Sequence, residues 1–326
     1  MDMKKISIIA IVLSAIAIIG EAFILTSNRE NDDELYRQAI RAEYKVFAPV
    51  LPDTMSFAGE RVPLELFYVY EGLDRELSSI MYQQLNTQLI IKRSARFFPV
   101  IEPILADNGI PEDFKYLCVT ESALTNATSP AKAQGFWQLL KGTAEEYGLE
   151  VTEEVDMRNN VEASTQAACS FLKYLYNRFG SWTLAAAAYN RGHNGLSRQM
   201  EQQETGNYYD MHLNSETSRY VYRILAYKLI LQNPQDFGFV LRHCDLYSPV
   251  PFITDTLSGR NVDLFQYAKR HDCTYKMFRF LNPWITSNTF TNKAGKTYTV
   301  KLPVTNGTHI SVITRGRKDT SLVERI

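Results

Sequence analysis

The sequence predicts a mainly α protein, in which an all-helical domain precedes a small α+β module. Between residues 64 and 240, apolar residues recur every three or four positions, which is typical of helices, and no strand pattern of any strength occurs there. Residues 297–303 instead alternate between apolar and polar side chains, as a strand does. The 326 residues, 45% of them hydrophobic, are enough for two domains with buried cores.

The predicted helices follow in order from Leu64, where the first begins. Its apolar positions are Leu73, Leu77, Ile80, Leu85 and Leu89. A shorter helix is expected from about Phe97 to Asn108, where Asn-Gly favours a stop. The next helix starts near Pro111, because proline fits a first helical turn and the acidic residues after it suit the positive end of the helix dipole. Further helices are expected at about 141–148, 160–179, 182–190 and 215–232.

The helix that starts near Pro111 has a carboxylate on its own apolar face. Phe114, Leu117 and Cys118 form that face, and a step of three or four residues from the last two reaches Glu121. A buried carboxylate without a partner is costly and tends to stay protonated. Such a glutamate, taken alone, is more often a paired structural group, so its role depends on the residues that accompany it.

The first 25 residues have the composition of an export segment. Two lysines precede an apolar run from Ile6 to Ile19, and the run counted through Leu25 reaches the length of a membrane-spanning helix. We interpret residues 1–25 as a retained membrane anchor, with cleavage of a signal peptide near Gly20 as the alternative. In either case the rest of the chain is exported, because the lysines stay inside. Residues 26–61, which are polar and contain prolines, are predicted to be a linker.

Several classes of function are excluded by composition. A net charge of −1 gives no basis for nucleic-acid binding. The five histidines and four cysteines show no metal-ligand spacing, and there is no glycine-rich phosphate loop, so we expect neither metal nor cofactor. Export would permit disulfides, and four cysteines allow three complete pairings. Cys118 and Cys169 lie on apolar helix faces, which favours buried thiols.

Five short motifs occur in a fixed order. They are Glu121-Ser122, Ala133-Gln-Gly-Phe-Trp-Gln138, Thr143 with Tyr147-Gly-Leu149, Ala188-Tyr-Asn-Arg-Gly192 and Glu216-Thr-Ser-Arg-Tyr-Val221. This order resembles the lytic transglycosylases of the goose-lysozyme-like superfamily, and in particular the membrane-bound lytic murein transglycosylase D group. The resemblance covers about residues 62–240. The departures are mild: Phe136 replaces the commoner Ile or Met, and Arg191 stands where Ala is common.

The resemblance implies a lysozyme-like catalytic domain over residues 62–245 and a role for each matching residue. Glu121 matches the single catalytic acid. The matching substrate-binding positions are Ser122, Ser129, Gln138, Tyr189, Asn190 and Glu216, of which Tyr189 corresponds to the tyrosine that faces the catalytic glutamate. The implied reaction cuts the β-1,4 bond between N-acetylmuramic acid and N-acetylglucosamine and leaves 1,6-anhydro ends. The implied partner is the peptidoglycan glycan strand, on the periplasmic side of a bacterial envelope, with the membrane contacted through the N-terminal segment.

The first acidic residues that follow Glu121 in the sequence, at positions 145, 146, 150, 153 and 154, lie in a segment of surface composition. We interpret them as solvated, not as a second catalytic acid. Two other functions stay open: a goose-type lysozyme, in which water attacks, and a catalytically silent peptidoglycan-binding scaffold.

The C-terminal part of the chain predicts two short helices within Val262–Leu281, followed by the strand at 297–303. Residues 246–304 resemble a degenerate LysM domain, in which the usual Gly-Asp-Thr opening is missing. LysM domains bind glycans that contain N-acetylglucosamine, so the resemblance implies glycan binding; the alternative is a small packing domain. Asn306-Gly307 is a turn signal, and residues 305–326 are predicted to be a hairpin or tail.

Overall fold

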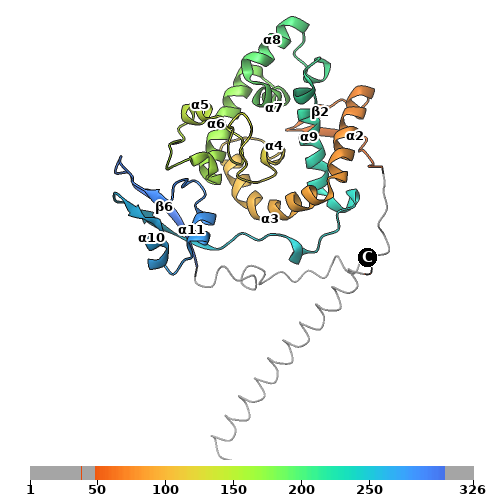
Figure 1. Ribbon diagram of the computed structural model, residues 1–326. Helices are drawn as coiled ribbons and strands as arrows, with labels where there is room; N and C mark the ends of the chain where they lie inside the picture. Colours follow the sequence, from red (N-terminus) through yellow and green to blue (C-terminus); the bar gives the residue numbers. More distant parts are fainter. Residues whose placement is uncertain (1–37, 39–47, 305–326) are drawn as a thin grey trace, which may run out of the picture. The chain divides into compact units, whose positions relative to one another are not determined.

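The computed structural model describes residue 38 and residues 48–304 (Figure 1). Over this range the predicted fold class is confirmed: an all-helical domain is followed by a small α+β module. The helices of the first domain are α2 (Phe67–Tyr82), α3 (Gln84–Asp107), α4 (Phe114–Ser122), α5 (Lys141–Glu146), α6 (Val161–Phe179), α7 (Trp182–Arg191), α8 (His193–Gln203) and α9 (Ser215–Gln232). Two short 3-10 turns lie between these helices, η1 (Met157–Asn159) and η2 (Tyr208–Asp210), and two more follow α9, η3 (Pro234–Phe237) and η4 (His243–Asp245).

A β-hairpin precedes the helices, in a region predicted to be linker. Strands β1 (Met55–Phe57) and β2 (Glu60–Val62) pair antiparallel. Phe57 is fully buried and its ring lies 5.3 Å from that of Phe114 at the start of α4. Asp113 accepts a hydrogen bond of 2.7 Å from the Ala58 N–H, which ties the hairpin turn to the same helix. The end of the predicted linker is therefore part of the folded domain, because this hairpin covers the N-terminal end of α4.

The boundary between the first two helices differs from the prediction. The break falls at Gln83, and α3 then continues for 24 residues through Pro99 and Pro103. Both prolines lie on the exposed face of the helix, so the carbonyl groups that lose an N–H partner can bond to water. Leu85, predicted to be inward, is 72% exposed. It lies after the break at Gln83, so the helical spacing of α2 does not extend to it.

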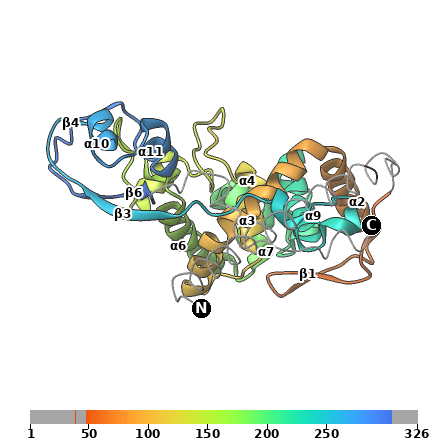
Figure 2. The same cartoon turned by 90° about the horizontal axis from the view of Figure 1, so that it is seen from below.

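Helix α4 lies in the middle of the helical domain, as Figures 1 and 2 both show. It packs against α3 and α9. Around it, α6 packs on α3 and α7, and α9 packs on α2 and α7. Four consecutive alanines of α7, residues 185–188, are fully buried, and their small side chains let the neighbouring helices approach closely. The helices predicted at about 141–148, 160–179, 182–190 and 215–232 are all present; α8 was not predicted.

The C-terminal module contains two helices and two small antiparallel strand pairs. Helices α10 (Leu264–Arg270) and α11 (Tyr275–Leu281) pack together, and α11 also packs on β6. Strand β3 (Phe252–Leu257) pairs with β6 (Tyr298–Pro303), and β4 (Val262–Asp263) pairs with β5 (Thr289–Phe290). Tyr298, Val300 and Leu302 all face the core, as their alternation predicts. The partner strand β3 was not predicted.

The predicted export segment at 1–25 and the predicted hairpin at 305–326 lie outside the described residues. Within residues 48–304, no helix combines the length and the apolar composition that a membrane crossing requires. Cys118 and Cys169 are buried thiols, as predicted, and Cys244 and Cys273 are also unpaired.

Candidate functional site

Glu121 occupies the last turn of α4, where the helix is stopped abruptly. The next two residues, Ala123 and Leu124, have left-handed backbone conformations with φ of 52° and 57°. Neither is a glycine, so each is held in a conformation that costs free energy for an L-residue. The Ala123 N–H still bonds to the Val119 carbonyl at 2.8 Å, which closes the final turn. The chain leaves α4 immediately after the carboxylate, which keeps Glu121 partly accessible at the edge of the core.

The surroundings of Glu121 favour its protonated form. Burial raises the pKa of this carboxyl, and the negative charge of Glu216 raises it further. The hydroxyl of Tyr220, on α9, donates a hydrogen bond to Oε1, and this bond and the charge of Arg223 act in the opposite direction. Burial dominates, and the net result is a pKa of about 7. A carboxyl with that pKa can give up a proton and take one back near neutral pH.

Two tyrosines lie near Glu121, and Tyr220 makes the hydrogen bond to it. Tyr189, which was expected to face the glutamate, donates its hydroxyl to the Trp137 carbonyl at 2.6 Å. Tyr189 is close enough for the Glu121 charge to raise its pKa, an effect that adds to the larger one of burial. Tyr220 belongs to the motif Glu216–Val221 but was not predicted as a site residue. Its position four residues after Glu216 on one helix, hence on the same face, could have identified it.

The loop between α4 and α5 is held by its own polar groups. Gln138, in a left-handed conformation with φ of 46°, donates from its amide to the carbonyls of Ala127 and Gly135, both at 2.8 Å. The Ser129 hydroxyl accepts from the Ala133 N–H at 3.0 Å. These two predicted substrate-binding residues therefore shape the loop that precedes α5.

The remaining predicted residues fall into two groups. Asn190 links α7 to α9: its amide donates to Glu216 at 3.2 Å and accepts from the Thr217 hydroxyl at 3.0 Å. Glu216 itself is exposed. Ser122, in contrast, is buried, and its hydroxyl donates back to the Cys118 carbonyl at 3.2 Å. Asn190 and Glu216 thus adjoin the Glu121 site, whereas Ser122 has a helix-terminating contact.

A second buried carboxylate, Glu76 on α2, lies near the same face of α9. It is 2% exposed and pairs with Arg75 at 3.2 Å, with Arg219 at 2.5 Å and with Arg223 at 3.6 Å. Arg219 and Arg223 lie on either side of Tyr220 in the sequence, so α9 supplies both the hydrogen-bond partner of Glu121 and two of the three partners of Glu76. This glutamate was not predicted, although it lies three residues after Leu73 and four before Ile80, on the apolar face of its own helix.

The acidic residues at 145–154 include two that are not simply solvated. Glu150 accepts hydrogen bonds from Tyr298 at 3.2 Å and Lys296 at 3.0 Å, and Glu154 accepts from the N–H of Thr291 at 3.0 Å. Both glutamates therefore contact residues of the C-terminal module. No cluster of three or more His, Cys, Asp or Glu side chains able to hold a metal ion occurs in the described part of the chain.

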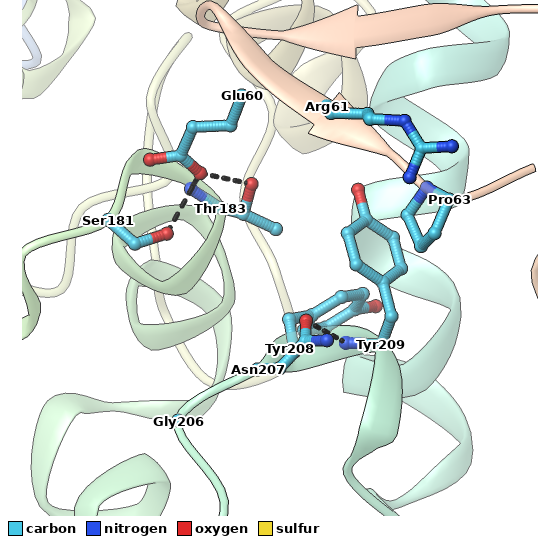
Figure 3. Close-up of a pocket in the computed structure, with 9 residues that line it drawn as sticks. All are labelled: Glu60, Arg61, Pro63, Ser181, Thr183, Gly206, Asn207, Tyr208 and Tyr209. Carbon is cyan, nitrogen blue, oxygen red and sulfur yellow. Dashed lines mark hydrogen bonds between the residues drawn. The ribbon is translucent and has the colours of Figure 1, made fainter.

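A pocket of about 250 Å³ lies elsewhere in the helical domain, between the β-hairpin and the N-terminal end of α7 (Figure 3). Glu60 forms one wall, and its carboxylate accepts hydrogen bonds from Ser181, Trp182 and Thr183 at 2.6 to 2.9 Å. Burial opposes ionisation of Glu60, but these bonds outweigh it and lower the pKa. The carboxylate therefore caps α7, and its capacity is used within the protein.

Comparison with known proteins assigns both modules. Residues 99–212 match the family described as Transglycosylase SLT domain, and residues 254–306 match the Soluble lytic transglycosylase C-terminal LysM-like domain. Among curated relatives, membrane-bound lytic murein transglycosylase D of Escherichia coli (strain K12) is 34% identical over 143 residues, which are 42% of this chain and 32% of that protein. A putative tributyltin chloride resistance protein of Alteromonas sp. (strain M-1) is 32% identical over 117 residues, which are 34% of this chain and 56% of that protein.

The two matches define the class: the chain contains a lysozyme-like transglycosylase SLT domain followed by a LysM-like domain. Within that class, a stretch of 143 residues is homologous to membrane-bound lytic murein transglycosylase D, and the chain spans only about a third of that protein, 32% of its length. Glu121, Ser129, Gln138, Tyr189 and Asn190 lie inside the matched SLT range. Glu216 and Tyr220 lie beyond it.

Proposed function

We propose that this protein is a peptidoglycan lytic transglycosylase. In this proposal it cleaves the β-1,4 bond between N-acetylmuramic acid and N-acetylglucosamine without water and leaves 1,6-anhydro ends. The observation that carries the proposal is Glu121: a carboxyl with a pKa of about 7, hydrogen-bonded to a buried tyrosine at the end of a central helix. The SLT match and the homology to a murein transglycosylase support the same reaction class.

The first step needs an acid. Protonated Glu121 donates its proton to the oxygen between the two sugars, and the bond from that oxygen to C1 of the muramic acid breaks. The 2-acetamido group of the same sugar stabilises the positive charge that develops at C1, so a second carboxylate is not required. Glu216, the other carboxylate that acts on the charge of Glu121, is exposed and bonded to Asn190. It is better suited to raising the pKa than to attacking the sugar.

The second step needs a base. Glu121, now ionised, removes the proton of the muramic acid C6 hydroxyl, and the C6 oxygen attacks C1 to close the anhydro ring. One residue is therefore acid and then base, and it ends protonated, as it began. Tyr220 fixes the direction of the carboxyl through its hydrogen bond. Tyr189 acts one step further away, because its hydroxyl fixes the carbonyl of Trp137, the residue before Gln138.

The remaining parts of the proposal concern binding and location. Ser129, Gln138, Tyr189, Asn190 and Glu216 line or shape the sugar site, and Ser122 supports the end of α4. The catalytic domain spans residues 62–245, and the LysM-like module, residues 246–304, contributes to peptidoglycan binding. We place the protein on the periplasmic side of a bacterial envelope, held to the membrane through residues 1–25.

The product distinguishes this enzyme from a lysozyme. Purified peptidoglycan is digested and the released fragments are analysed by mass spectrometry. A transglycosylase yields anhydro ends, lighter by one water than the reducing ends that a lysozyme yields. Reducing ends alone would reject the transglycosylase in favour of a goose-type lysozyme. Binding of peptidoglycan without any release would favour the silent scaffold instead.

The Glu121→Gln variant tests the assignment of the catalyst. The matched control is Glu145→Gln, which removes a carboxylate from the exposed side of α5. We expect release to be lost in the first variant and retained in the second. Full release by Glu121→Gln would reject Glu121 as the acid.

A further inference from the structure

A short segment of the helical domain completes the core of the LysM-like module. Val155 lies between α5 and α6 in the sequence, yet it is 2% exposed within the core cluster of the module. It pairs as an isolated antiparallel bridge with Ile285. The N–H of Asp156 donates to the Trp284 carbonyl at 2.8 Å, which continues the same pairing. The module therefore uses residues 150–156 as a structural element.

Glu154 adds a clasp beside that bridge. One carboxylate oxygen accepts from the Thr291 N–H at 3.0 Å, and the other accepts from the Asn292 N–H at 3.1 Å. Its carbonyl accepts from the Thr286 N–H at 2.9 Å. Hydrogen bonds from backbone N–H groups to a carboxylate are charge-assisted and directional, so this contact fixes the position of residues 154–156 on the module.

Asp156, which is held by this contact, in turn orients the side chain of Arg158. The guanidinium donates to both carboxylate oxygens, from Nε at 2.8 Å and from Nη2 at 2.6 Å. The two side chains are only 9% and 11% exposed. A paired, planar guanidinium in a buried position has one orientation, unlike a surface arginine. The ion pair with Asp156 therefore also fixes the direction of the third nitrogen, Nη1.

That third nitrogen holds the loop of residues 127–139. Nη1 of Arg158 donates to the carbonyls of Lys132 and Leu139, both at 3.1 Å, and so bridges two points of the loop. The carbonyl of Arg158 lies so close to Gly135 that a Cβ there would approach it to 2.0 Å, which leaves room for glycine alone. A further bond of 2.8 Å joins Gln134 to Asn159. The loop therefore rests on η1 along much of its length.

The end of the loop is connected to the proposed catalytic residue through Tyr189. The Trp137 carbonyl accepts from Tyr189, and the charge of Glu121 acts on the Tyr189 hydroxyl. Contacts are thus continuous from the core of the module through Val155, Asp156 and Arg158 to the loop, and the loop contacts the tyrosine beside Glu121. Such a continuous chain permits coupling, and only a measured response proves it.

We propose that the LysM-like module positions the catalytic loop, with Asp156 and Arg158 as positioning residues for the reaction. The module is then part of the support of the site as well as a glycan-binding candidate. The kinetic part of this inference rests on the proposed transglycosylase function; the positioning of the loop does not.

The loop can be probed without any activity measurement. Lys132 is exposed at the loop tip, so trypsin can cut the Lys132–Ala133 bond when the loop opens. The whole chain is digested under native conditions, and the new end at Ala133 is followed by mass spectrometry. We expect Arg158→Lys and Glu154→Gln each to increase the cleavage rate about tenfold, because each removes charge-assisted bonds that hold the loop or its support.

A control in the same module tests whether any destabilisation has the same effect. Tyr267→Phe removes a hydrogen bond of 2.6 Å to Asp255, within the module and apart from residues 150–158. Cleavage at Lys132 should stay at the parental rate in this variant. An increase equal to that of Glu154→Gln would reject a specific path through residues 154–158.

Kinetics on soluble glycan strands separate positioning from simple loss of folded protein. Unfolding lowers the concentration of active enzyme and therefore kcat alone, whereas a misplaced loop weakens binding. We expect KM to rise about tenfold in Glu154→Gln and Arg158→Lys, with kcat nearly unchanged. A parental protein without activity would reject the proposed function. The trypsin result would still show whether the module holds the loop of residues 127–139 in place. Unchanged cleavage and unchanged KM in Glu154→Gln would overturn the proposal.

Discussion

Two glutamates of the helical domain, the buried Glu76 and the partly accessible Glu121, both contact α9 but have different electrostatic surroundings. Glu76 is surrounded by the guanidinium groups of Arg75, Arg219 and Arg223. Glu121 has a neutral hydrogen-bond partner, the Tyr220 hydroxyl; the charge of Glu216 raises its pKa and the charge of Arg223 lowers it. Helix α9 thus supplies arginines to one site and a tyrosine to the other. Burial raises the pKa of a carboxyl to a useful range for catalysis only where no close ion pair offsets that burial.

The largest expected effect is on catalysis at the uncompensated site. In Glu121→Gln, the amide cannot exchange the proton that both steps require. General acid-base catalysis contributes on the order of 10²- to 10⁴-fold, so release of anhydro fragments should fall by about that factor. The measurement is the initial rate of fragment release by the purified variant. A loss of the same size in Glu76→Gln, measured on folded protein, would break the distinction between the two sites.

The next effect is on stability at the compensated site. Glu76→Gln removes the charge that three arginines share, and a buried ionic site with one partner removed is destabilised by about 3–5 kcal/mol. Because the arginines are partly exposed, the expected loss lies at the low end of that range. Urea unfolding at pH 7 measures it. The control is Arg61→Gln, which breaks an exposed pair with Glu65 and should change the free energy of unfolding by less than about 1 kcal/mol.

A third prediction is that Glu121 itself lowers stability at high pH. Its pKa is about 7 in the folded protein and near its ordinary value of 4.5 when unfolded. Between these pH values the folded state binds more protons, so stability falls as pH rises. At pH 8 the full penalty, up to about 3 kcal/mol, is present, and at pH 4 it is absent.

Thermal or urea unfolding of Glu121→Gln checks this sign. The variant should be more stable than the parent at pH 8 and equal to it at pH 4. A variant that is less stable at both pH values would show that Glu121 is compensated like Glu76.

The smallest expected effect is on the pH profile. Arg223→Gln removes a positive charge that lowers the pKa of Glu121, so that pKa should rise. Since the first step needs the protonated acid, the alkaline fall of kcat/KM should move upward, by roughly half a pH unit for a partly exposed charge. Glu216→Gln should move it the other way, because its charge raises the same pKa. Shifts in the same direction in both variants would contradict these charge assignments.

The sequence predicted the helical elements well where one pattern decided them. The apolar spacing of α6 and the alternation of β6 agree with the structure, because each of these elements buries mainly one face. Helix α4 was predicted from the same spacing, but it is buried on all sides from Phe114 to Val119. The break at Gln83 was misplaced, because prolines on a solvent-facing side of α3 do not stop a helix. The strand β3 was missed, since its side chains are mostly exposed and it is defined by its pairing with β6.

The site was predictable in its residue types and less so in its contacts. Spacing places Glu121 on the apolar face of its own helix, and the order of the five motifs, not spacing alone, identified it as the candidate acid. Its bond to Tyr220 joins residues 99 positions apart, which no local pattern encodes. The roles of Glu150 and Glu154 were missed for the same reason: their composition is that of a surface, and their partners lie more than 130 residues further along the chain.

The insertion of Val155 into the neighbouring core also limits how such a chain can change by recombination. A LysM-like module transferred from residue 246 onward would leave behind the valine that fills its interior and the carboxylate that clasps its strand ends. The inherited unit is therefore discontinuous: the module and the segment 150–156 are expected to be exchanged, lost or duplicated together.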